Sequence, residues 1–491
     1  MNTKLSLGAL LVAVLAGLPL HPTVAADNSA LKAAAMDYID AESAILAQTS
    51  RAIWSYAETS LEESQSSAVL QDLLRASDFE VEAGVAGMPT AFVATYGSGA
   101  PVIGILAEYD ALPGVSQAAT PTPQTGPNPL AGHACGHSVF GAGSAGAALA
   151  LAELMRTGKL SGTLRLYGTP AEETGIGKVY MLRAGLFDDV DVMLGWHPGS
   201  MTLVPYGTSM ALVNVKVRFR GAAAHAAAQP YAGRSALDAV ELMNMGVNMM
   251  REHVKDDARI HYVITNGGGQ PNVVPPEAEV WYYIRAYKFT DVVAYFERFK
   301  EIAAGAAQMT QTAVEAIEIQ SEIHEMIPVR SLAEVMHANL TAIGPPAWSA
   351  AELEFARATQ KNYVANALSQ LPADAPALHA EILPLPPQPI KGSASTDIGD
   401  ISWFVPVGNV MVAGYGYGLP THSWPVVAAS GSAIGDRALI VAAKAIAATA
   451  IDIYRDPELL AAIQADFKAT RGTAPWQTLI PEGQQAPRQV R

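Results

Sequence analysis

The chain has 491 residues, half of them hydrophobic, and a formal net charge of −15 at pH 7. A chain of this length and composition can bury the cores of two domains. The acidic balance argues against binding to nucleic acid or to an anionic membrane, because both attract basic proteins.

A short apolar segment opens the chain. Lys4 precedes the hydrophobic residues 5–20, and the small residues TVAA follow at positions 23–26. This pattern is typical of a secretory signal peptide, and the apolar run is too short for a comfortable membrane span. We therefore expect a signal peptide over residues 1–26, cleaved near Ala26. The mature protein is expected to be periplasmic or secreted, with no stable membrane anchor.

Hydrophobic patterning over the next part of the chain predicts an α/β fold. Residues 31–76 have helical periodicity, and a long apolar helix is expected over residues 138–155. Short apolar strands are expected at residues 91–96, 102–107, 163–167 and 190–196. Strands that alternate with helices predict a mostly parallel sheet with helices on both faces. The site of such a sheet lies at the carboxyl ends of its strands.

The pattern changes near residue 211. Residues 213–220 (VNVKVRFR) alternate strictly between apolar and polar, which is typical of a sheet with one solvated face. Further strands are expected at 260–265, 278–285 and 410–413, and helices at 235–253, 292–309 and 431–453. We therefore predict a smaller α+β lid or dimerisation domain, residues 208–325, inserted into a catalytic domain. That catalytic domain comprises residues 27–207 and 326–465, followed by an irregular tail at 466–491.

The only cysteine of the chain lies between two histidines, in the sequence GHACGH of residues 132–137. A lone cysteine cannot form an intrachain disulfide, so this motif indicates metal or redox chemistry. Cys135 and His137 can share an ion only in an irregular turn, which Gly136 permits. A position at the start of the following helix favours the thiolate form of the cysteine. The alternative is a small buried cysteine in a glycine-rich loop.

Four further polar clusters follow predicted strands or a glycine-rich turn, at residues 105–110, 169–173, 195–198 and 420–424. Taken singly each cluster is weak, since an isolated histidine or carboxylate is usually a capping or surface group. Together with the cysteine motif they offer thiolate, imidazole and carboxylate groups. That is the ligand set of a hydrolytic zinc or manganese site.

A series of motifs runs through residues 35–455 in a fixed order: AEYDALPG, GHACGH, GTPAEETG, WHPG, FRGAAAHAA, GRSALDAVELM, PNVVPPEAEV, SASTDIGD and THSW. On these motifs the chain resembles the aminoacylase/carboxypeptidase metallopeptidase family of two-metal amidohydrolases. It is most similar to the branch that holds aminobenzoyl-glutamate, hippurate and auxin-conjugate hydrolases. The resemblance implies hydrolysis of N-acyl or N-aroyl amino acids, with aminobenzoyl-glutamate-like conjugates favoured. Dipeptides and amide-linked toxins or aromatic conjugates are the alternative substrates.

The resemblance also implies roles for individual residues. Glu172 matches the general base, which takes a proton from metal-activated water. Asp110 is expected to orient a metal ligand from behind. Two divalent ions are expected, with Zn²⁺ favoured by the thiolate and Mn²⁺ or Co²⁺ as alternatives. The implied metal ligands are Cys135, His137, Glu173, His197 and His422.

Three residues of the predicted insertion match the family's substrate-binding positions. His225 matches a histidine that stabilises the oxyanion across a dimer interface, so the resemblance implies a homodimer formed through the inserted domain. Asn272 and Arg285 match positions that hold the α-carboxylate of the substrate. The alternatives are a strand-end surface role for His225 and an ion pair of Arg285 with a glutamate such as Glu279.

The chain departs from the family pattern at two positions. Glu108 stands where many relatives have the first histidine of an H-x-D motif. It could be a metal ligand, contact the substrate, or do neither. Ser138 stands where several members of the branch have aspartate, which alters metal preference without changing the ligand count. The loop Ser395–Asp397 resembles a loop near the site in the aminobenzoyl-glutamate hydrolase group, and we expect it to lie behind the ligands.

Two other classes of function remain as alternatives. The sequence AGSAG around Ser144 loosely matches the nucleophile elbow of serine esterases, but no strand immediately precedes it. A binding subunit without catalysis would keep the fold and lose part of the chemistry, whereas this chain retains the full ligand set and Glu172. Turnover that is abolished by a chelator would separate the three possibilities.

Overall fold

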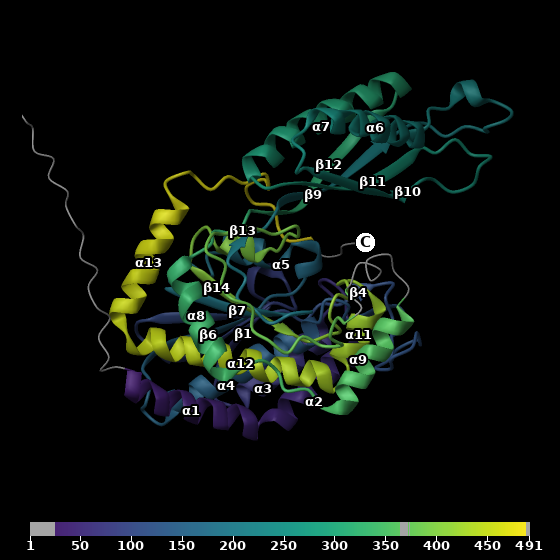
Figure 1. Cartoon of the computed structure of the whole chain (residues 1–491). Coiled ribbons are helices and arrows are strands. Elements are labelled where there is room, and N and C mark those ends of the chain that lie inside the picture. The colour runs from purple at the N-terminus through teal and green to yellow at the C-terminus, as the bar shows by residue number, and fades with distance from the viewer. Residues whose placement is uncertain (1–24, 364–371, 373, 488–491) are drawn as a thin grey trace, which may run out of the picture.

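The computed structural model describes residues 25–363, 372 and 374–487. The predicted signal peptide lies outside the described residues, apart from its last two positions. Figure 1 shows two bodies, a large one that contains the start of the described chain and a smaller one that projects from it.

A six-stranded sheet forms the centre of the large body (Figure 1). Four consecutive strands, up to one edge of the sheet, run parallel, and the two strands at the other edge pair antiparallel. In spatial order the strands are β1 (Glu80–Ala83), β2 (Phe92–Ser98), β6 (Gly162–Gly168), β3 (Val102–Ala107), β7 (Val192–Gly199) and β14 (Val407–Ala413). The predicted mostly parallel sheet is confirmed, and the nearly all-apolar β3 is buried as such a strand requires.

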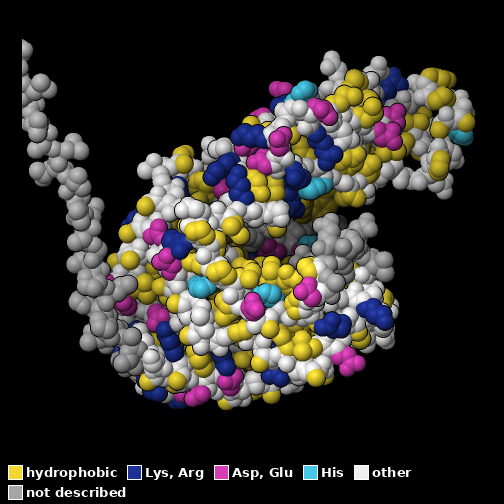
Figure 2. All heavy atoms as spheres, in the orientation of Figure 1, with side chains coloured by type: hydrophobic (Ala, Val, Ile, Leu, Met, Phe, Trp, Pro, Cys, Tyr) yellow, Lys and Arg dark blue, Asp and Glu magenta, His cyan; other side chains and the backbone are white. Residues whose placement is uncertain are grey.

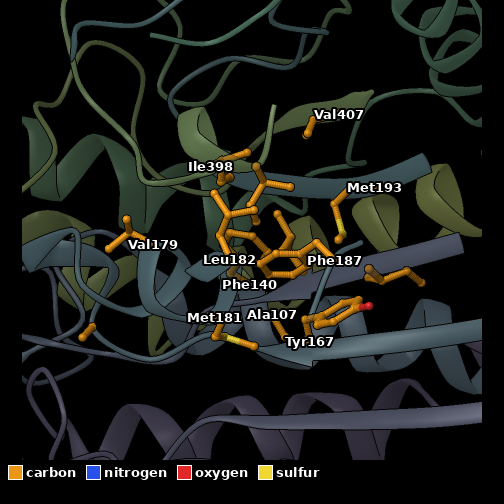
Figure 3. Packing of buried hydrophobic residues seen from close by; sticks show 14 of the residues in the cluster. Ala107, Phe140, Tyr167, Val179, Met181, Leu182, Phe187, Met193, Ile398 and Val407 are labelled. Atoms are coloured by element: carbon orange, nitrogen blue, oxygen red, sulfur yellow. The ribbon is translucent and has the colours of Figure 1, made fainter. Parts of the chain in front are cut away.

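Helices cover both faces of this sheet. Helix α4 (His137–Arg156) packs on β3, β6 and β7, and α12 (Ala433–Arg455) packs on β7 and β14. Helices α1 (Ala25–Ala41) and α2 (Ser43–Tyr56) form a further layer against α4. On the side that faces the smaller body lies α5 (Gly177–Arg183) (Figure 1). Figure 3 shows Leu182 of α5 among the buried side chains of the core.

The small residues of α4 allow its neighbours to approach closely. A Cβ atom at Gly146 would lie 2.6 Å from the side chain of Leu46 in α2, so a larger residue there would require this side chain to move. Within the described chain α4 is the single straight helix with the length and apolar composition of a membrane span, and α11 with α12 would qualify only as a pair bent by 70°. Nearly all of α4 is buried against the sheet, as in a core helix.

The smaller body contains a four-stranded antiparallel sheet. Two helices, α6 (Ala236–Met250) and α7 (Phe289–Thr310), pack against it. The strands, in spatial order, are β10 (Arg259–Asn266), β11 (Glu277–Ala286), β9 (Ala211–Arg220) and β12 (Ala313–Ile323). All of these elements lie within the segment predicted to be an insertion, although strand β12 itself was not predicted.

The remaining elements connect and cover the two sheets. The helices are α3 (Ser64–Arg75), α8 (Arg330–Ile343), α9 (Ala350–Asn362), α10 (Ile398–Ile401), α11 (Trp424–Ser430) and α13 (Pro457–Arg471). The short strands are β4 (Leu112–Pro113), β5 (Ala131–Gly132), β8 (Gly207–Thr208) and β13 (Ile390–Lys391).

The C-terminal segment differs from its prediction. Instead of an irregular tail from residue 466, helix α13 continues to Arg471, because Ile463 and Phe467 pack into the core. Asp456 caps the start of this helix by accepting hydrogen bonds from two main-chain N–H groups. The residues beyond α13 are mostly irregular, and Ile480 among them is buried.

Candidate active site

The polar clusters of the sequence meet at the carboxyl ends of the parallel strands, the edge where the fold predicts a site. Glu108 and Asp110 follow β3, the Glu172–Glu173 pair follows β6, and His197 lies near the end of β7. His422 comes from the loop between β14 and α11. Four segments that are far apart in the sequence therefore contribute side chains to one place.

The cysteine motif forms the irregular turn that the sequence predicts. Gly136 has a φ of 81°, and a Cβ atom there would lie 2.6 Å from Pro198, so glycine is required on both counts. Cys135 Sγ lies 3.3 Å from His197 Nε2. The other histidine of the motif, His133, is buried and bonds through its Nε2 to the carbonyl of Ile53, so it has a structural role.

His137 is held by one nitrogen and free at the other. Its Nδ1 lies 2.8 Å from Asp110 Oδ1 and donates to this carboxylate, which leaves the Nε2 lone pair available to a metal. Nε2 lies 3.2 Å from Glu108 Oε2 and 3.8 Å from Glu172 Oε2. Neither Nε2 nor Glu108 Oε2 has a hydrogen-bond partner, although both atoms are buried.

The turn that carries Glu172 and Glu173 is held from two sides. Ala171 adopts the left-handed conformation with a φ of 58°, which is strained for a residue with a Cβ atom. Its N–H donates to Glu63 Oε1 at 2.9 Å, and the N–H of Glu173 donates to Asp110 Oδ2 at 2.9 Å. Glu63 is fully buried and was missed by sequence reasoning, because nothing in its local sequence indicates a partner 108 residues away.

His422 approaches the site from the solvent side. It has a φ of 61°, and its N–H donates to the carbonyl of Ala134, next to the cysteine, at 2.9 Å. Its Nε2 lies 3.3 Å from Glu173 Oε2, and its side chain is about half exposed. The backbone of the cysteine motif thus fixes the loop that supplies this imidazole.

The arrangement fits two divalent cations. Two sets of ligand atoms, each within 4.8 Å of one another, share the cysteine: Cys135 with His137 and His197, and Cys135 with Glu173 and His422. The buried atoms His137 Nε2 and Glu173 Oε1 have no hydrogen-bond partner, which is unfavourable unless a cation binds them. The two sets share one thiolate; the first adds two imidazoles, and the second adds a carboxylate and an imidazole. These donors suit zinc or manganese.

Without a cation, two of the predicted ligands favour their protonated forms. Burial, followed by the negative charge of Glu173, raises the pKa of the Cys135 thiol, so the helix start does not stabilise a thiolate by itself. Burial also raises the pKa of Glu173 to about 8. Cation binding at this site must therefore release protons from both ligands.

A cavity of about 450 Å³ opens onto these groups, between the two bodies. Figure 2 shows the hollow in the space-filling view, with acidic and histidine side chains inside it. Apart from the metal-site residues it has largely apolar walls, including Leu212, Tyr283, Ile323 and Tyr415. Arg285 is the cationic side chain that β11 places in this wall.

Arg285 does not pair with Glu279. Its Nη1 donates to Ser395 Oγ at 3.3 Å, its guanidinium lies over the ring of Tyr283, and its buried Nε has no partner. Glu279 instead lies 3.9 Å from Arg218 and accepts a hydrogen bond from Thr265. The ion-pair alternative is therefore wrong, and the guanidinium retains donors for a ligand in the cavity.

The structure places His225 and Asn272 away from the cavity of their own chain. His225 is exposed in a loop of the smaller body, where its Nδ1 accepts hydrogen bonds from the N–H groups of Ala227 and Ala228. The carbonyl of Asn272 accepts a hydrogen bond from Ala226 in the same loop pair. Neither residue is among those that line the cavity.

The serine-esterase alternative is wrong. Ser144 lies in the middle of α4, fully buried, with α4 beginning seven residues before it. A nucleophile elbow requires a strand directly before the serine and an exposed hydroxyl. This hydroxyl cannot reach a substrate in the cavity.

Two ligand sets that share a cysteine lie at the carboxyl edge of a parallel sheet, with a further glutamate beside them. This arrangement defines a metal-dependent hydrolase. Residues 104–477 match the model of peptidase family M20/M25/M40, and the chain belongs to this family. It is a metallo-amidohydrolase, and two divalent metal ions are the cofactors that the family and the site support.

Two curated relatives match along nearly their whole length. The chain is 38% identical over 468 residues to a subunit of the p-aminobenzoyl-glutamate hydrolase of Escherichia coli, and the match covers 91% of this chain and 96% of that protein. It is 31% identical over 464 residues to Xaa-Arg dipeptidase of Mus musculus, where the match covers 90% and 94%.

Solved structures share the fold at lower sequence identity. A dinuclear metal-binding peptidase of the M20 family from Bacillus subtilis has a TM-score of 0.54 at 19% identity and covers 84% of this chain and 99% of its own. The aminobenzoyl-glutamate utilization protein of Klebsiella pneumoniae has a TM-score of 0.54 at 19% identity, with 82% and 97% covered.

Proposed function

We propose that this chain is an exported amidohydrolase that releases an amino acid from its N-acyl or N-aroyl conjugate, with aminobenzoyl-glutamate-like conjugates first among the substrates. The observation that carries the proposal is one cavity that holds both the cysteine-sharing ligand sets and the guanidinium of Arg285. Metal ions bound by the ligand sets would act on the amide of the substrate. The guanidinium of Arg285 would hold its carboxylate. The name of the Escherichia coli relative supports the aroyl-amino-acid class.

The metal ions, when bound, supply Lewis acidity that polarises an amide carbonyl and makes water a stronger acid at neutral pH. Cys135, His137 and His197 would hold one ion, and Cys135, Glu173 and His422 the other. The thiolate favours zinc, and manganese and cobalt are the alternatives.

Glu172 is the proton carrier in this proposal. It lies beside the ligand sets, with Oε2 3.8 Å from His137 Nε2, and it lines the cavity. Burial, and then the negative charges of Glu108 and Asp397, raise the pKa of this carboxyl above that of an ordinary glutamate. A carboxylate of raised basicity takes a proton from the attacking water and passes it to the amine nitrogen that leaves.

Arg285 is the anchor for the carboxylate of the amino acid. Nη1 of Arg285 donates to Ser395, whereas the buried Nε–H has no partner. Nε–H and the neighbouring Nη2–H point in parallel, as a carboxylate requires for a bidentate pair. The apolar remainder of the wall suits an aromatic acyl group or an apolar side chain. Dipeptides are the alternative substrate class, supported by the Xaa-Arg dipeptidase relative.

The exposed loop of His225 supports a homodimer as part of the proposal. Strand β10 lies at the free edge of its sheet and exposes Tyr262, Val263 and Ile264. An apolar open edge is a surface that pairs readily with a second strand. A dimer through this edge would let His225 of the partner subunit reach a cavity that its own chain leaves open. A histidine donor at the developing oxyanion is worth about 3 kcal/mol of barrier.

Export rests on the apolar run of residues 5–20 and the small residues that follow it. The mature chain would then act in the periplasm or outside the cell. A fusion of residues 1–40 to a reporter that is active only outside the cytoplasm tests this part separately.

The hydrolysis test uses the chain from residue 27 onward and a panel of p-aminobenzoyl-glutamate, N-benzoyl-glycine, N-acetyl amino acids and Xaa-Arg dipeptides. Released amino acid is measured with and without a chelator, and after zinc, manganese or cobalt is added back. We expect turnover that the chelator abolishes and a metal restores. Turnover that survives the chelator, or no turnover of any conjugate by protein with two bound ions, would contradict the proposal.

A further inference from the structure

A buried lysine lies behind the active site and takes no part in the chemistry proposed above. Lys178, in the first turn of α5, has a side chain with no exposed surface. Its Nζ lies 2.7 Å from Glu108 Oε1 and 2.7 Å from Asp397 Oδ1. Burying an ammonium group is unfavourable unless it is paired, and here it is paired twice.

Asp397 is held by both of its carboxylate oxygens. Its Oδ1 accepts from Lys178 Nζ, and its Oδ2 accepts from the main-chain N–H of the same lysine at 3.1 Å. Asp397 directly precedes α10, yet its side chain does not cap that helix. The carboxylate is therefore used to join α10 and the segment before it to α5.

The segment before Asp397 forms one wall of the cavity, and we call residues 392–396 the pocket loop. Its first end is tied to the strand β8 region, where Gly392 N donates to Thr208 O at 2.8 Å and Met210 N donates to Ala394 O at 2.9 Å. Its second end is fixed by the Lys178–Asp397 pair. Residues between the two ends are exposed or half-exposed, so the tied ends determine where the loop lies.

The pocket loop also contacts the smaller body across the cavity. Ser395 Oγ accepts the hydrogen bond from Arg285 Nη1, at 3.3 Å, and Arg285 belongs to the smaller body. Lys178 is therefore linked to Arg285 through its hydrogen bond to Asp397, the backbone from Asp397 to Ser395, and the hydrogen bond that Ser395 accepts from Arg285.

We propose that Lys178 is a positioning residue for substrate recognition: by clamping Asp397 it fixes the pocket loop, so that Ser395 orients the guanidinium of Arg285 toward the substrate carboxylate. The inference rests on the proposed function, because it takes Arg285 as the carboxylate anchor. A role limited to neutralising Glu108 and Asp397 is the competing account. Under that account, loss of Lys178 lowers stability but affects substrates with and without a carboxylate equally.

The kinetic test compares Lys178→Met, Ser395→Ala and the double variant on the best substrate of the panel and on its α-carboxamide analogue. A hydrogen bond to a charged group is worth about one factor of ten, so Lys178→Met should raise KM for the acid about 10-fold, with a much smaller change in kcat. Ser395→Ala should do the same, and the double variant should add little. The carboxamide should be hydrolysed equally by all of them. Lys444→Met, which removes a lysine that pairs with Asp40 at the surface, is the matched control and should leave KM unchanged.

The proposal would be overturned by any of three results. The rises in KM could multiply in the double variant, KM for the carboxamide could rise equally, or KM in Lys178→Met could be unchanged. If the wild-type chain hydrolyses none of the panel, the proposed function fails but the positioning role is still tested by hydrogen exchange on the metal-free protein. Peptides covering residues 392–399 should exchange faster in Lys178→Met than in the wild type or in Lys444→Met, while peptides of α12 should not. Should Lys178→Met not fold, Asp397→Asn, which keeps one acceptor oxygen, takes its place in both measurements. Equal exchange of the pocket loop in the folded variant overturns the inference.

Discussion

Asp110 Oδ2 accepts a hydrogen bond from the main-chain N–H of Glu173 at 2.9 Å. The other oxygen of the same carboxylate accepts from His137 Nδ1 at 2.8 Å. One buried carboxylate thus orients a ligand from each of the two sets that share the cysteine. Burial raises the pKa of Asp110, but His137, the Glu173 N–H and Lys178 lower it by more. The net shift is downward, so the carboxylate stays ionised.

Asp110→Asn should weaken metal binding by about 10- to 100-fold, the usual effect of losing a group that orients a ligand. The amide of asparagine can accept only one of the two hydrogen bonds and turns a donor toward the other. Competition with a chromogenic chelator measures the affinity. Asp436→Asn, at an aspartate that pairs with Arg51 and belongs to neither ligand set, is the control. Equal affinity in Asp110→Asn and the wild type would show that Asp110 does not orient the ligands.

Cys135→Ser should weaken the binding of both ions, because the cysteine belongs to both ligand sets. His422→Ala removes a ligand from one set alone and should leave one ion firmly bound. Elemental analysis after gel filtration measures the metal content per chain of both variants and the wild type. A Cys135→Ser protein that still retains two ions would mean that the thiolate is not shared.

Glu63→Ala should destabilise the fold by about 1–3 kcal/mol, because the N–H of Ala171 loses its buried acceptor in a strained turn. Glu63→Gln keeps an oxygen for that N–H and should be much closer to the wild type. Thr90→Val removes only the hydrogen bond to the other carboxylate oxygen, and it controls for the loss of a buried polar contact. Denaturant unfolding followed by circular dichroism gives the three values. If Thr90→Val and Glu63→Ala are equally destabilised, the link to Ala171 is unimportant.

The free energy of unfolding should depend on pH through Glu322. Burial, and then the negative charge of Asp400, raise the pKa of this carboxyl to about 7. Between the unfolded value near 4.5 and about pH 7, the unfolded chain ionises at this residue while the folded chain keeps its proton. Stability that is fully present below pH 4.5 is therefore lost as the pH rises to about 7, by at most about 3 kcal/mol.

Glu322→Gln cannot ionise, so its stability should fall less than that of the wild type over this interval. Urea unfolding at pH 5, 6, 7 and 8 of both proteins measures the difference. Other buried acids titrate in the same interval, and they cancel in the comparison. Curves for the two proteins that run parallel would refute the assignment.

Local sequence patterns were sufficient for five of the six strands of the central sheet, all but β1, and for the polar clusters that supply the ligands. The apolar VIGILA of β3 and the alternating VNVKVRFR of β9 each report the burial of one strand directly. Strand β12 was missed because its glutamates, at positions 315, 318 and 322, do not recur every second residue and its last five residues are all buried. Its period is therefore clear only after the neighbouring strand β9 is known.

Contacts between distant segments could not be predicted from one sequence. Glu63 and Lys178 each act on a residue more than 100 positions away, at Ala171 and Asp397, and neither lies in a recognisable motif. The pKa of the Cys135 thiol likewise depends on contacts that the sequence does not show. The start of a helix is visible in the sequence, whereas the burial and the acidic neighbour that outweigh it appear only in the fold.

The central claim is metal-dependent amide hydrolysis in which Glu172 moves the proton. The most direct measurement is turnover of the best panel substrate by Glu172→Gln, with the metal content of the variant determined on the same sample. Loss of a general base typically lowers kcat by about 10²- to 10⁴-fold, and we expect this loss with two ions still bound and KM little changed. A variant that keeps both ions and turns over within a few-fold of the wild type would contradict the account.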